Sequence, residues 1–222
     1  MANLDGELRN DLREAYDRKA LERESYPIAD WKIRVRQDFL ALLQAEQKRT
    51  LLELGAGPGR DARFFQDNGL QVTCVDLSAE MVELCRQKGL AAEVMDCGDL
   101  RFAAESFEAV YALNCLLHLP KHELPSVLRS IDVILKPAGV FYLGVYGGVD
   151  HEGVWQDDTY EPKRFFSFFV DEQLQQAVTK VFEVLSFQRI LLSKENSNLH
   201  FQSLILRKRN VTGSRSTTPN AF

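Results

Sequence analysis

The sequence predicts an α/β fold in which helices cover both faces of a doubly wound, mostly parallel sheet. Two observations carry this prediction. Between Thr50 and Tyr146, short apolar runs alternate with amphipathic helical segments, a pattern typical of consecutive βαβ units. Towards the C-terminus, two β-rich runs at Val184–Leu192 and Leu199–Arg207 are joined by a polar stretch. We therefore expect a C-terminal hairpin that adds an antiparallel strand to the sheet.

The predicted elements follow one another in a regular order. Apolar residues at helical spacing predict two helices within Leu4–Leu43, separated at Pro27, which disfavours helical backbone in the residue before it. The strands of the parallel sheet are expected at Thr50–Leu54, Leu70–Val75, Ala91–Met95, Phe107–Leu113 and Val140–Tyr146. The helices between them are expected at Arg60–Asp67, Ser78–Lys88 and Pro120–Leu135.

Capping residues support these helix boundaries. Asn68-Gly69 and Gly89 are expected to end the first two crossover helices, because these residue types tolerate left-handed backbone. Ser78 is expected to cap the second helix at its N-terminus. A last helix is expected at Asp171–Lys180, with Asp171 as its N-cap.

The predicted organisation is a helical cap over residues 1–49, one core domain over 50–209 and a disordered, Ser/Thr-rich tail over 210–222. Within the core domain, residues 147–170 are aromatic and polar with no clear period. We interpret this stretch as an insertion over the edge of the sheet.

Composition excludes several function classes. Lys and Arg total 27 against 32 Asp and Glu, a net charge of −5, which argues against the broad basic face of a nucleic-acid-binding protein. No apolar run approaches the roughly 18 residues of a membrane span, and the N-terminus resembles no signal peptide. The four cysteines form no C-x-x-C pair, so we expect free thiols, no metal site and a cytoplasmic protein.

A glycine-rich loop follows the first predicted strand in the segment Glu53-Leu-Gly55-Ala-Gly57-Pro-Gly59, and a helix follows the loop. Glycines at this place let the chain turn sharply and let a ligand approach bare backbone. Asp76 ends the next strand about 20 residues later, where an acid can accept hydrogen bonds from ribose hydroxyls. This order of strand, loop, helix, strand and acid predicts a nucleoside-binding site.

Glu53, the acid beside the loop, indicates which nucleoside ligand this site binds. Dinucleotide sites use G-x-G-x-x-G and bind a pyrophosphate, which Glu53 would repel. S-adenosylmethionine has a sulfonium, an ammonium and no phosphate, so it fits this loop better than NAD does.

The segments LLELGAGPGRD, CVDLS, MDCGDL, ALNCLLHLP and LKPAGVFYLGVY extend this pattern from Thr50 to Tyr146. In this order they resemble successive motifs of the class I S-adenosylmethionine-dependent methyltransferases, and they are most similar to the branch that acts on small molecules, such as the quinone-biosynthesis enzymes. The resemblance implies a Rossmann-like fold, S-adenosyl-L-methionine as cofactor with S-adenosyl-L-homocysteine as product, and methyl transfer to an oxygen, nitrogen or carbon.

The resemblance also implies a set of cofactor-binding residues at the ends of the strands. They are Glu53, Gly55, Ala56, Gly57, Asp61, Asp76, Leu77, Met81, Asp96, Cys97 and Asn114. In this set Glu53 and the loop surround the methionyl part, Asp76 binds the ribose hydroxyls, and Asp96 accepts a hydrogen bond from the adenine amine.

The acceptor site is predicted around His118, which follows the fourth strand at the sheet edge where open α/β folds bind ligands. His118 is the candidate catalytic base, with simple lining of the pocket as the alternative. The predicted acceptor-binding residues are Tyr16, Tyr146, Trp155, Tyr160 and Arg164. Arg164 is expected to grip a carboxylate or phosphate of the acceptor. The alternative is that Tyr16 and the aromatic residues only pack against the sheet.

Two other functions stay open at this stage: a non-catalytic S-adenosylmethionine-binding module and an NAD(P)-dependent oxidoreductase. The fourth strand lacks the Asn/Asp-Pro-Pro-aromatic motif and has Asn114-Cys-Leu-Leu instead, which disfavours methylation of a nucleobase amine. The expected partner is therefore a small-molecule acceptor and not a nucleic acid, and the protein is expected to be a monomer or a homodimer.

Overall fold

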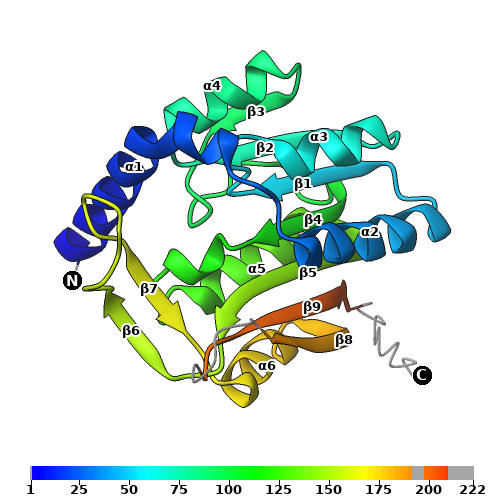
Figure 1. The fold of residues 1–222 in the computed structure, drawn as a ribbon. Coiled ribbons are helices and arrows are strands. Elements are labelled where there is room, and N and C mark those ends of the chain that lie inside the picture. Colours follow the sequence, from blue (N-terminus) through cyan, green and yellow to red (C-terminus); the bar gives the residue numbers. More distant parts are fainter. Residues whose placement is uncertain (1, 192–197, 210–222) are drawn as a thin grey trace, which may run out of the picture.

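The structure is a computed structural model that describes residues 2–191 and 198–209. Its main sheet has seven strands in the order β3-β2-β1-β4-β5-β9-β8 (Figure 1). The strands are β1 (Thr50–Leu54), β2 (Gln71–Asp76), β3 (Ala91–Val94), β4 (Phe107–Leu113), β5 (Leu135–Gly147), β8 (Phe182–Leu191) and β9 (His200–Lys208). Strands β1 to β5 pair in parallel, whereas β9 pairs antiparallel with both β5 and β8.

Helices cover both faces of this sheet, which confirms the predicted fold class. The helices are α1 (Ala2–Ser25), α2 (Asp30–Ala45), α3 (Arg60–Asp67), α4 (Ala79–Gln87), α5 (Leu124–Ile134) and α6 (Asp171–Thr179). Helices α2, α3 and α4 pack on one face through a core that includes Phe39, Phe65 and Val82. Helices α5 and α6 pack on the other face, where Leu128 and Leu174 belong to a second core cluster.

Aromatic rings fill the centre of the first core. Tyr111 of β4 stacks on Tyr142 of β5, with ring centroids 4.8 Å apart, and Phe39 and Phe65 contact the same pair. All four side chains are fully buried. Burial of each such ring stabilises the fold by about 1.5–3 kcal/mol. This packing holds β1, β4 and β5 in the centre of the sheet and makes their carboxyl ends a rigid platform.

The predicted caps at the ends of α3 and at both ends of α4 agree with the structure. Gly69 and Gly89 have positive φ angles just after α3 and α4, and the Ser78 hydroxyl accepts a hydrogen bond from the Met81 N–H at 3.1 Å. The prediction for Asp171 was wrong, because Val170 is the N-cap of α6. The Asp171 side chain is instead buried against the hairpin, where it bonds to His200, Gln202 and Arg189.

The region from 147 to 170 is more regular than its sequence pattern indicated. It forms a separate two-stranded antiparallel sheet of β6 (His151–Val154) and β7 (Phe165–Phe168). The run Phe165-Phe166-Ser167-Phe168 has no alternation of polar and apolar residues, so no strand was predicted there. A 3₁₀ turn, η1 (Leu116–His118), precedes α5, and α5 itself begins at Leu124 and not at Pro120.

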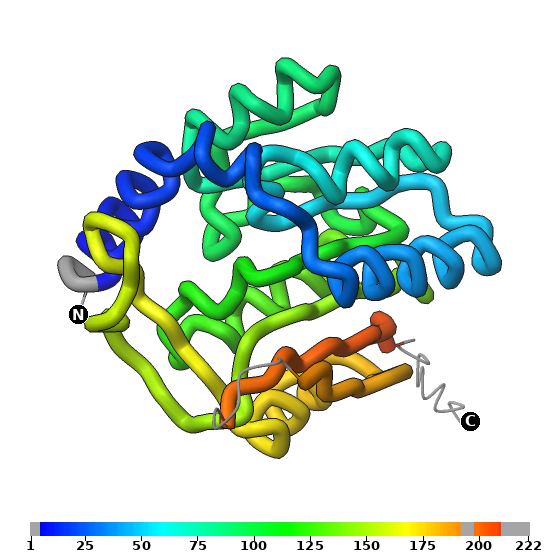
Figure 2. The backbone as a smooth tube through the Cα atoms, viewed as in Figure 1, coloured from blue at the N-terminus to red at the C-terminus, as the bar shows by residue number. Residues whose placement is uncertain are grey.

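Helix α1 lies across the carboxyl ends of the strands, beside α4 and close to the β6–β7 sheet (Figures 1 and 2). Ala20 packs against Met81 and Leu84 of α4. Arg18 donates a hydrogen bond to the Glu161 carbonyl at 3.4 Å, which joins α1 to the loop between β6 and β7. The division into a cap over 1–49 and a core over 50–209 stays a prediction, and the predicted tail over 210–222 lies outside the described residues. No helix in the described part of the chain is long and apolar enough to cross a membrane.

Candidate functional site

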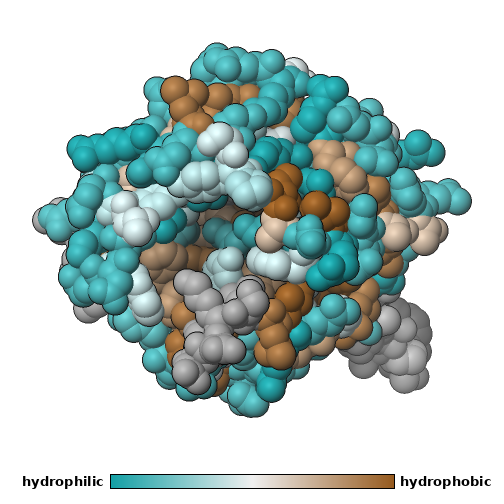
Figure 3. All heavy atoms as spheres, viewed as in Figure 1, coloured by the Kyte–Doolittle hydropathy of each residue, from teal (hydrophilic) through white to brown (hydrophobic). Residues whose placement is uncertain are grey.

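A cavity of about 610 Å³ lies at the carboxyl ends of β1, β2, β4 and β5. Helix α1 and the β6–β7 sheet cover it, and the surface is hollowed at this place (Figure 3). Open α/β sheets bind their ligands at this edge, because the crossover connections diverge there and leave a crevice. The position and size of the cavity suit a small organic ligand or two adjacent ones.

The glycine loop forms the floor at one end of the cavity. Gly57 has φ +54°, and a Cβ atom placed on it would meet nothing within 4 Å, so its backbone is open to a ligand. Gly55 has φ +63°, and a Cβ there would come within 2.6 Å of the Cys115 side chain. Gly57 thus gives a ligand open access to the backbone, and Gly55 allows the loop to pass close to the end of β4.

Asp76 fixes the loop from the end of β2. Its Oδ2 accepts a hydrogen bond from the Gly57 N–H at 2.8 Å, and its Oδ1 accepts one from the Ser78 N–H at 2.9 Å. Burial raises the pKa of Asp76, and these two backbone hydrogen bonds act in the opposite direction. A carboxylate has about four lone-pair positions, so two stay available to a ligand in the cavity.

Glu53 lies beneath the loop with only 4 % of its surface exposed. Its Oε2 is buried and has no hydrogen-bond partner among the described residues. Burial, and then the negative charge of Asp61, raise the pKa of Glu53 well above its ordinary value. A buried acceptor without a donor is costly, so this position is complete only when a donor, preferably a cationic one, reaches it from the cavity.

Asp96 is held at the opposite side of the cavity by a residue of α1. Arg9 donates from its Nε to Asp96 Oδ2 and from a terminal nitrogen to Glu123. The Gly98 N–H donates to Asp96 Oδ1 at 2.8 Å. Arg9 thereby ties the N-terminal helix to the segment after β3 and to the start of α5.

Asn114 ends β4 in an unusual backbone conformation. Its φ is +56°, a left-handed value that Asn tolerates better than most residues do. Its N–H donates to the Gly144 carbonyl at 2.7 Å, while its buried Oδ1 has no partner among the described residues. Strained backbone with an unsatisfied polar group is typical of functional sites.

Tyr16 and His118 meet at the other end of the cavity. The His118 Nδ1 lies 2.9 Å from the Phe165 carbonyl, which can only accept, so Nδ1 carries the proton. The His118 Nε2 therefore accepts a hydrogen bond from the Tyr16 hydroxyl at 2.8 Å. Burial lowers the pKa of His118 to about 3. The imidazole is neutral near pH 7, and both of its nitrogens are engaged.

Arg164, the residue before β7, also contacts this cluster. Its Nε and one terminal nitrogen donate to the Asp158 carboxylate, each at 2.8 Å, and the other terminal nitrogen donates to the Tyr16 hydroxyl at 3.0 Å. The guanidinium stacks on Tyr160, 3.6 Å from the ring centroid. Its charge is therefore balanced within the protein, and its role as the acceptor-gripping residue stays a prediction.

The structure brings most of the predicted site residues to this one cavity. The predicted residues that line it are Glu53, Gly55, Ala56, Gly57, Asp61, Asp76, Leu77, Asp96, Cys97 and Asn114 on the cofactor side, and Tyr16, His118, Tyr146, Trp155 and Arg164 on the acceptor side. Met81 is not among the lining residues, because it is fully buried between α1 and α4. Tyr160 is also buried and does not line the cavity, and its hydroxyl accepts a hydrogen bond from Arg23.

Sequence reasoning missed Arg9 and Arg23, two cavity-lining residues of α1. A signal for both was present. Arg9, Tyr16 and Arg23 follow one another at intervals of seven residues, which places them on one face of a helix. Charged residues on a helix usually face water, and only the structure shows that this face covers the cavity.

Comparison with known proteins shows what this chain is similar to. Residues 51–139 match the family model described as a methyltransferase domain. The ubiquinone biosynthesis O-methyltransferase of Xanthomonas campestris pv. campestris is 32 % identical over 118 residues, which cover 49 % of this chain and 48 % of the relative. The demethylmenaquinone methyltransferase of Tropheryma whipplei is 28 % identical over 134 residues, which cover 59 % and 54 %. The chain thus spans about half the length of the curated relatives it matches.

The fold is shared over a longer stretch. The crystal structure of a Burkholderia thailandensis 1,6-didemethyltoxoflavin-N1-methyltransferase aligns with 92 % of this chain and 90 % of that one, with a TM-score of 0.69 and 22 % sequence identity. That protein was solved with 1,6-didemethyltoxoflavin and S-adenosylhomocysteine bound. At this identity the likeness shows a common fold and not a common substrate.

Proposed function

We propose that this chain, a member of the class I S-adenosylmethionine-dependent methyltransferases, transfers the methyl group of S-adenosyl-L-methionine to a small-molecule acceptor and releases S-adenosyl-L-homocysteine. The observation that carries the proposal is one cavity with two chemically different ends. One end has the glycine loop, Asp76 and the unpartnered Glu53. The other end has Tyr16, His118 and aromatic walls, and it leaves room for a second ligand.

The residues of the first end fit the cofactor. Asp76 holds the open Gly57 backbone in place and keeps acceptor positions that suit two ribose hydroxyls. The buried Oε2 of Glu53 has no donor among the described residues, and the ammonium of the methionyl part would supply a cationic one. Asp96 would meet the adenine amine, and Arg9 holds its carboxylate in position. When bound, the cofactor supplies a methyl group activated by a positively charged sulfur.

Positioning accounts for most of the rate increase in such a reaction. The acceptor atom must lie in line with the carbon–sulfur bond, and a well-oriented pair of reactants can gain about 7–11 kcal/mol from pre-paid entropy. The rigid ends of β4 and β5, with the strained Asn114 and with Tyr146, form the wall that would hold this alignment. No covalent intermediate on the protein is required.

We further propose that His118 acts mainly as a positioning residue. Its two nitrogens are engaged with Phe165 and Tyr16, and its lowered pKa keeps it neutral. It therefore holds the Tyr16 hydroxyl towards the acceptor end. The sequence-based prediction of a base role is retained as the competing hypothesis, in which the His118→Ala variant would lose the acidic limb of its pH–rate profile, where the rate rises with pH.

Further features of the proposal concern partners and location. The net charge of −5 supports a small-molecule acceptor and no nucleic acid. Cys74, Cys85, Cys97 and Cys115 all carry free thiols, which supports a reducing, cytoplasmic location. The protein would act as a monomer or a homodimer.

A radiochemical assay tests the proposed activity. The protein is incubated with methyl-labelled S-adenosylmethionine and fractionated metabolite pools, and labelled product and S-adenosylhomocysteine are quantified together. We expect equal amounts of both with at least one pool, and at least about tenfold less transfer by the Asp76→Ala variant at a cofactor concentration that does not saturate it. Binding of the cofactor without transfer to any pool would instead support the non-catalytic binding module.

A further inference from the structure

Arg23 differs from the other buried arginines of the protein. Its side chain is half-buried, and it donates a hydrogen bond to the Tyr160 hydroxyl at 3.0 Å. Its Nε is buried without any partner among the described residues, and no carboxylate of that part of the chain lies within ion-pair distance. A buried cation without a counter-charge is unfavourable, so a ligand is expected to supply one.

The other buried arginines differ from Arg23 because each of them forms an ion pair. Arg36 and Arg207 also have a buried Nε without a partner, but each forms an ion pair, the first with Asp61 at 2.9 Å and the second with Glu46. Arg164, on the same side of the cavity as Arg23, is neutralised by Asp158. Arg23, unlike these three arginines, has no ion pair among the described residues, and its charge acts on Asp76 only at longer range.

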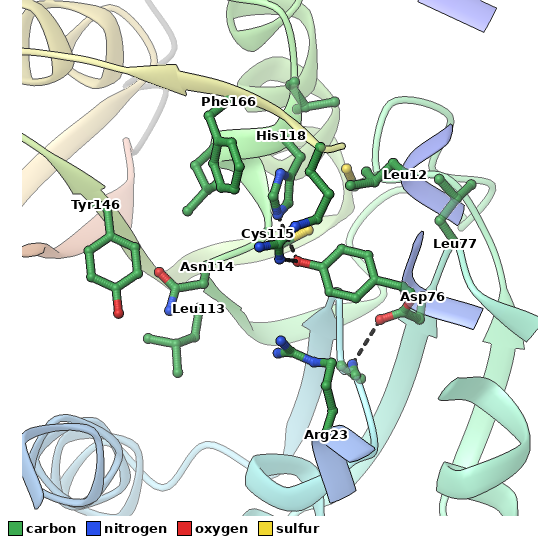
Figure 4. A pocket seen from close by; sticks show the side chains of 18 of the residues that line it. Leu12, Arg23, Asp76, Leu77, Leu113, Asn114, Cys115, His118, Tyr146 and Phe166 are labelled. Carbon is green, nitrogen blue, oxygen red and sulfur yellow. Dashed lines mark hydrogen bonds between the residues drawn. The ribbon is translucent and has the colours of Figure 1, made fainter. Parts of the chain in front are cut away.

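Arg23 also reaches well into the cavity. Figure 4 shows its side chain extending from α1 towards the interior, with Asp76 to one side and Asn114 and Tyr146 to the other. Its guanidinium carbon lies 5.1 Å from the centre of the Tyr16 ring. Burial lowers the pKa of His118 and raises that of Tyr146, and the charge of Arg23 favours a lower pKa for both groups. This charge thus acts on groups from α1, η1 and β5.

At the same end of the cavity, His118 and Tyr16 offer no free proton acceptor. The His118 nitrogens are both engaged, and the Tyr16 hydroxyl donates to His118 while it accepts from Arg164. The lining around them is aromatic, with Tyr146, Trp155, Phe166 and Phe168 in the wall. Neither His118 nor Tyr16 is free to take a proton from an acceptor, whereas an acceptor already ionised would find the cation of Arg23.

We propose that the methyl acceptor binds as an oxyanion on a flat aromatic body, and that Arg23 is the specificity-determining residue that supplies its counter-charge. The inference rests on the proposed function. Burial of an oxyanion in an apolar pocket is costly, and a guanidinium with an unused donor offsets that cost. Neutral analogues of the same shape would leave Arg23 unpaired.

The reaction then balances without a base. A lone pair of the ionised oxygen forms the bond to the methyl carbon, and the electron pair of the carbon–sulfur bond returns to sulfur. The negative acceptor and the positive sulfonium become two neutral groups, so no proton has to leave the site. Arg23 holds the anion near the reacting carbon before the bond forms.

The methionyl carboxylate of the cofactor is the other possible source of an anion. Lys32, a half-buried ammonium that lines the same cavity, can also take this carboxylate. Burial and then the charge of Arg23 lower the pKa of Lys32, whereas the charge of Asp61 raises it. The experiment must nevertheless separate the two sources. S-adenosylhomocysteine carries the carboxylate, and 5′-methylthioadenosine has the same nucleoside without the amino-acid part.

The first arm of the test measures nucleoside binding by calorimetry in the wild type and in the variants Arg23→Gln and Arg23→Lys. Arg18→Gln, on the exposed face of the same helix, is the matched control. We expect Arg23→Gln to bind both nucleosides within about threefold of the wild type. A loss of S-adenosylhomocysteine affinity of tenfold or more, with 5′-methylthioadenosine unaffected, would assign Arg23 to the cofactor and overturn the proposal.

The second arm titrates 2-naphthoate and 2-naphthamide into the protein saturated with S-adenosylhomocysteine. We expect the carboxylate to bind at least about tenfold more tightly than the amide, since a charge-assisted hydrogen bond contributes about 1.5–3 kcal/mol. Arg23→Gln should remove this difference, and Arg23→Lys should restore much of it. Equal affinities in the wild type, undetectable naphthoate binding, or a preference that survives in Arg23→Gln would overturn the proposal. If the wild type binds no S-adenosylhomocysteine at all, the proposed function itself fails.

Discussion

The Asp76 carboxylate connects two parts of the site, because the same group that holds the Gly57 and Ser78 backbone is expected to bind the ribose. We predict that Asp76→Ala weakens S-adenosylhomocysteine binding by about 10- to 100-fold, the effect of losing hydrogen bonds to a charged acceptor. Calorimetry measures the affinity, and circular dichroism checks that the variant folds. Asp67→Ala, at the exposed end of α3, is the control. Unchanged affinity in Asp76→Ala would show that the ribose binds elsewhere.

Glu53 gives a prediction about pH. Burial raises its pKa in the free protein, so part of the population carries a proton there, and a bound ammonium would lower that pKa again. Binding should therefore release a proton from Glu53, and affinity should rise with pH until the raised pKa of the free protein is passed. Calorimetry in buffers of different ionisation enthalpy measures this release. Glu53→Gln should lose it, and an identical release in that variant would contradict the assignment.

The stacked tyrosines of the core give a matched pair of stability predictions. The Tyr111 hydroxyl is buried without a partner among the described residues, whereas the Tyr142 hydroxyl lies 3.0 Å from Ser203 Oγ. Tyr111→Phe should leave the free energy of unfolding unchanged or raise it by about 1 kcal/mol, and Tyr142→Phe should lower it by about 1 kcal/mol. Urea unfolding measures both. The opposite order would show that the Tyr111 hydroxyl has a partner in solution.

At the scale of elements, α1 is attached to the core mainly by polar contacts. Arg9 bonds to Asp96, Asp17 accepts from the Ser78 hydroxyl, and Lys88 pairs with Glu24. Partly exposed contacts of this kind are weak individually, so local opening of α1 should cost less than global unfolding. The helix would then let ligands enter and would close over them.

Hydrogen exchange tests this behaviour of α1. We predict that amides of residues 5–25 exchange at least several-fold faster than those of β1 and β4 in the free protein, and that S-adenosylhomocysteine slows them. Arg9→Gln should increase the exchange of α1 in the free protein and leave that of β4 unchanged. Slow exchange of α1 that does not respond to the ligand would mean that the helix is a fixed part of the core.

The strands and crossover helices could be predicted because each follows from a local pattern. Strand β1 followed by the glycine loop, and α4 capped by Ser78, need no knowledge of distant residues. Other features depend on contacts between distant parts of the chain. The Arg9–Asp96 bond joins residues 87 positions apart, and β7 becomes a strand by pairing with β6 although its sequence does not alternate.

The candidate site shows the same limit at residue level. Asp76 and Glu53 could be found because the motif itself specifies their positions after β2 and before the loop. The partner of Arg164 could not be found, because Asp158 reaches it only through the turn between β6 and β7. That ion pair balances the charge of Arg164, the arginine predicted from the aromatic segment. Arg23, in contrast, has no ion pair in the part of the chain that the structure describes.

At the scale of the molecule, two cores hold the sheet rigid while a polar helix and a small second sheet cover its ligand-binding edge. This arrangement predicts that the stable part of the protein, the main sheet, and the mobile part of the site, helix α1, are different segments. The cavity also holds acidic groups, Glu53 and Asp76, as well as the cation Arg23, which has no ion pair among the described residues. We expect the acidic groups to bind a cationic ligand group and Arg23 to bind an anionic one.

Calorimetric titration of the wild-type protein with S-adenosylhomocysteine and, separately, with NAD tests the central claim most directly. The account predicts one site per chain for S-adenosylhomocysteine with an affinity in the micromolar range or tighter, about 8 kcal/mol of binding free energy, and no measurable heat with NAD. Saturable binding of NAD with no response to S-adenosylhomocysteine would contradict it.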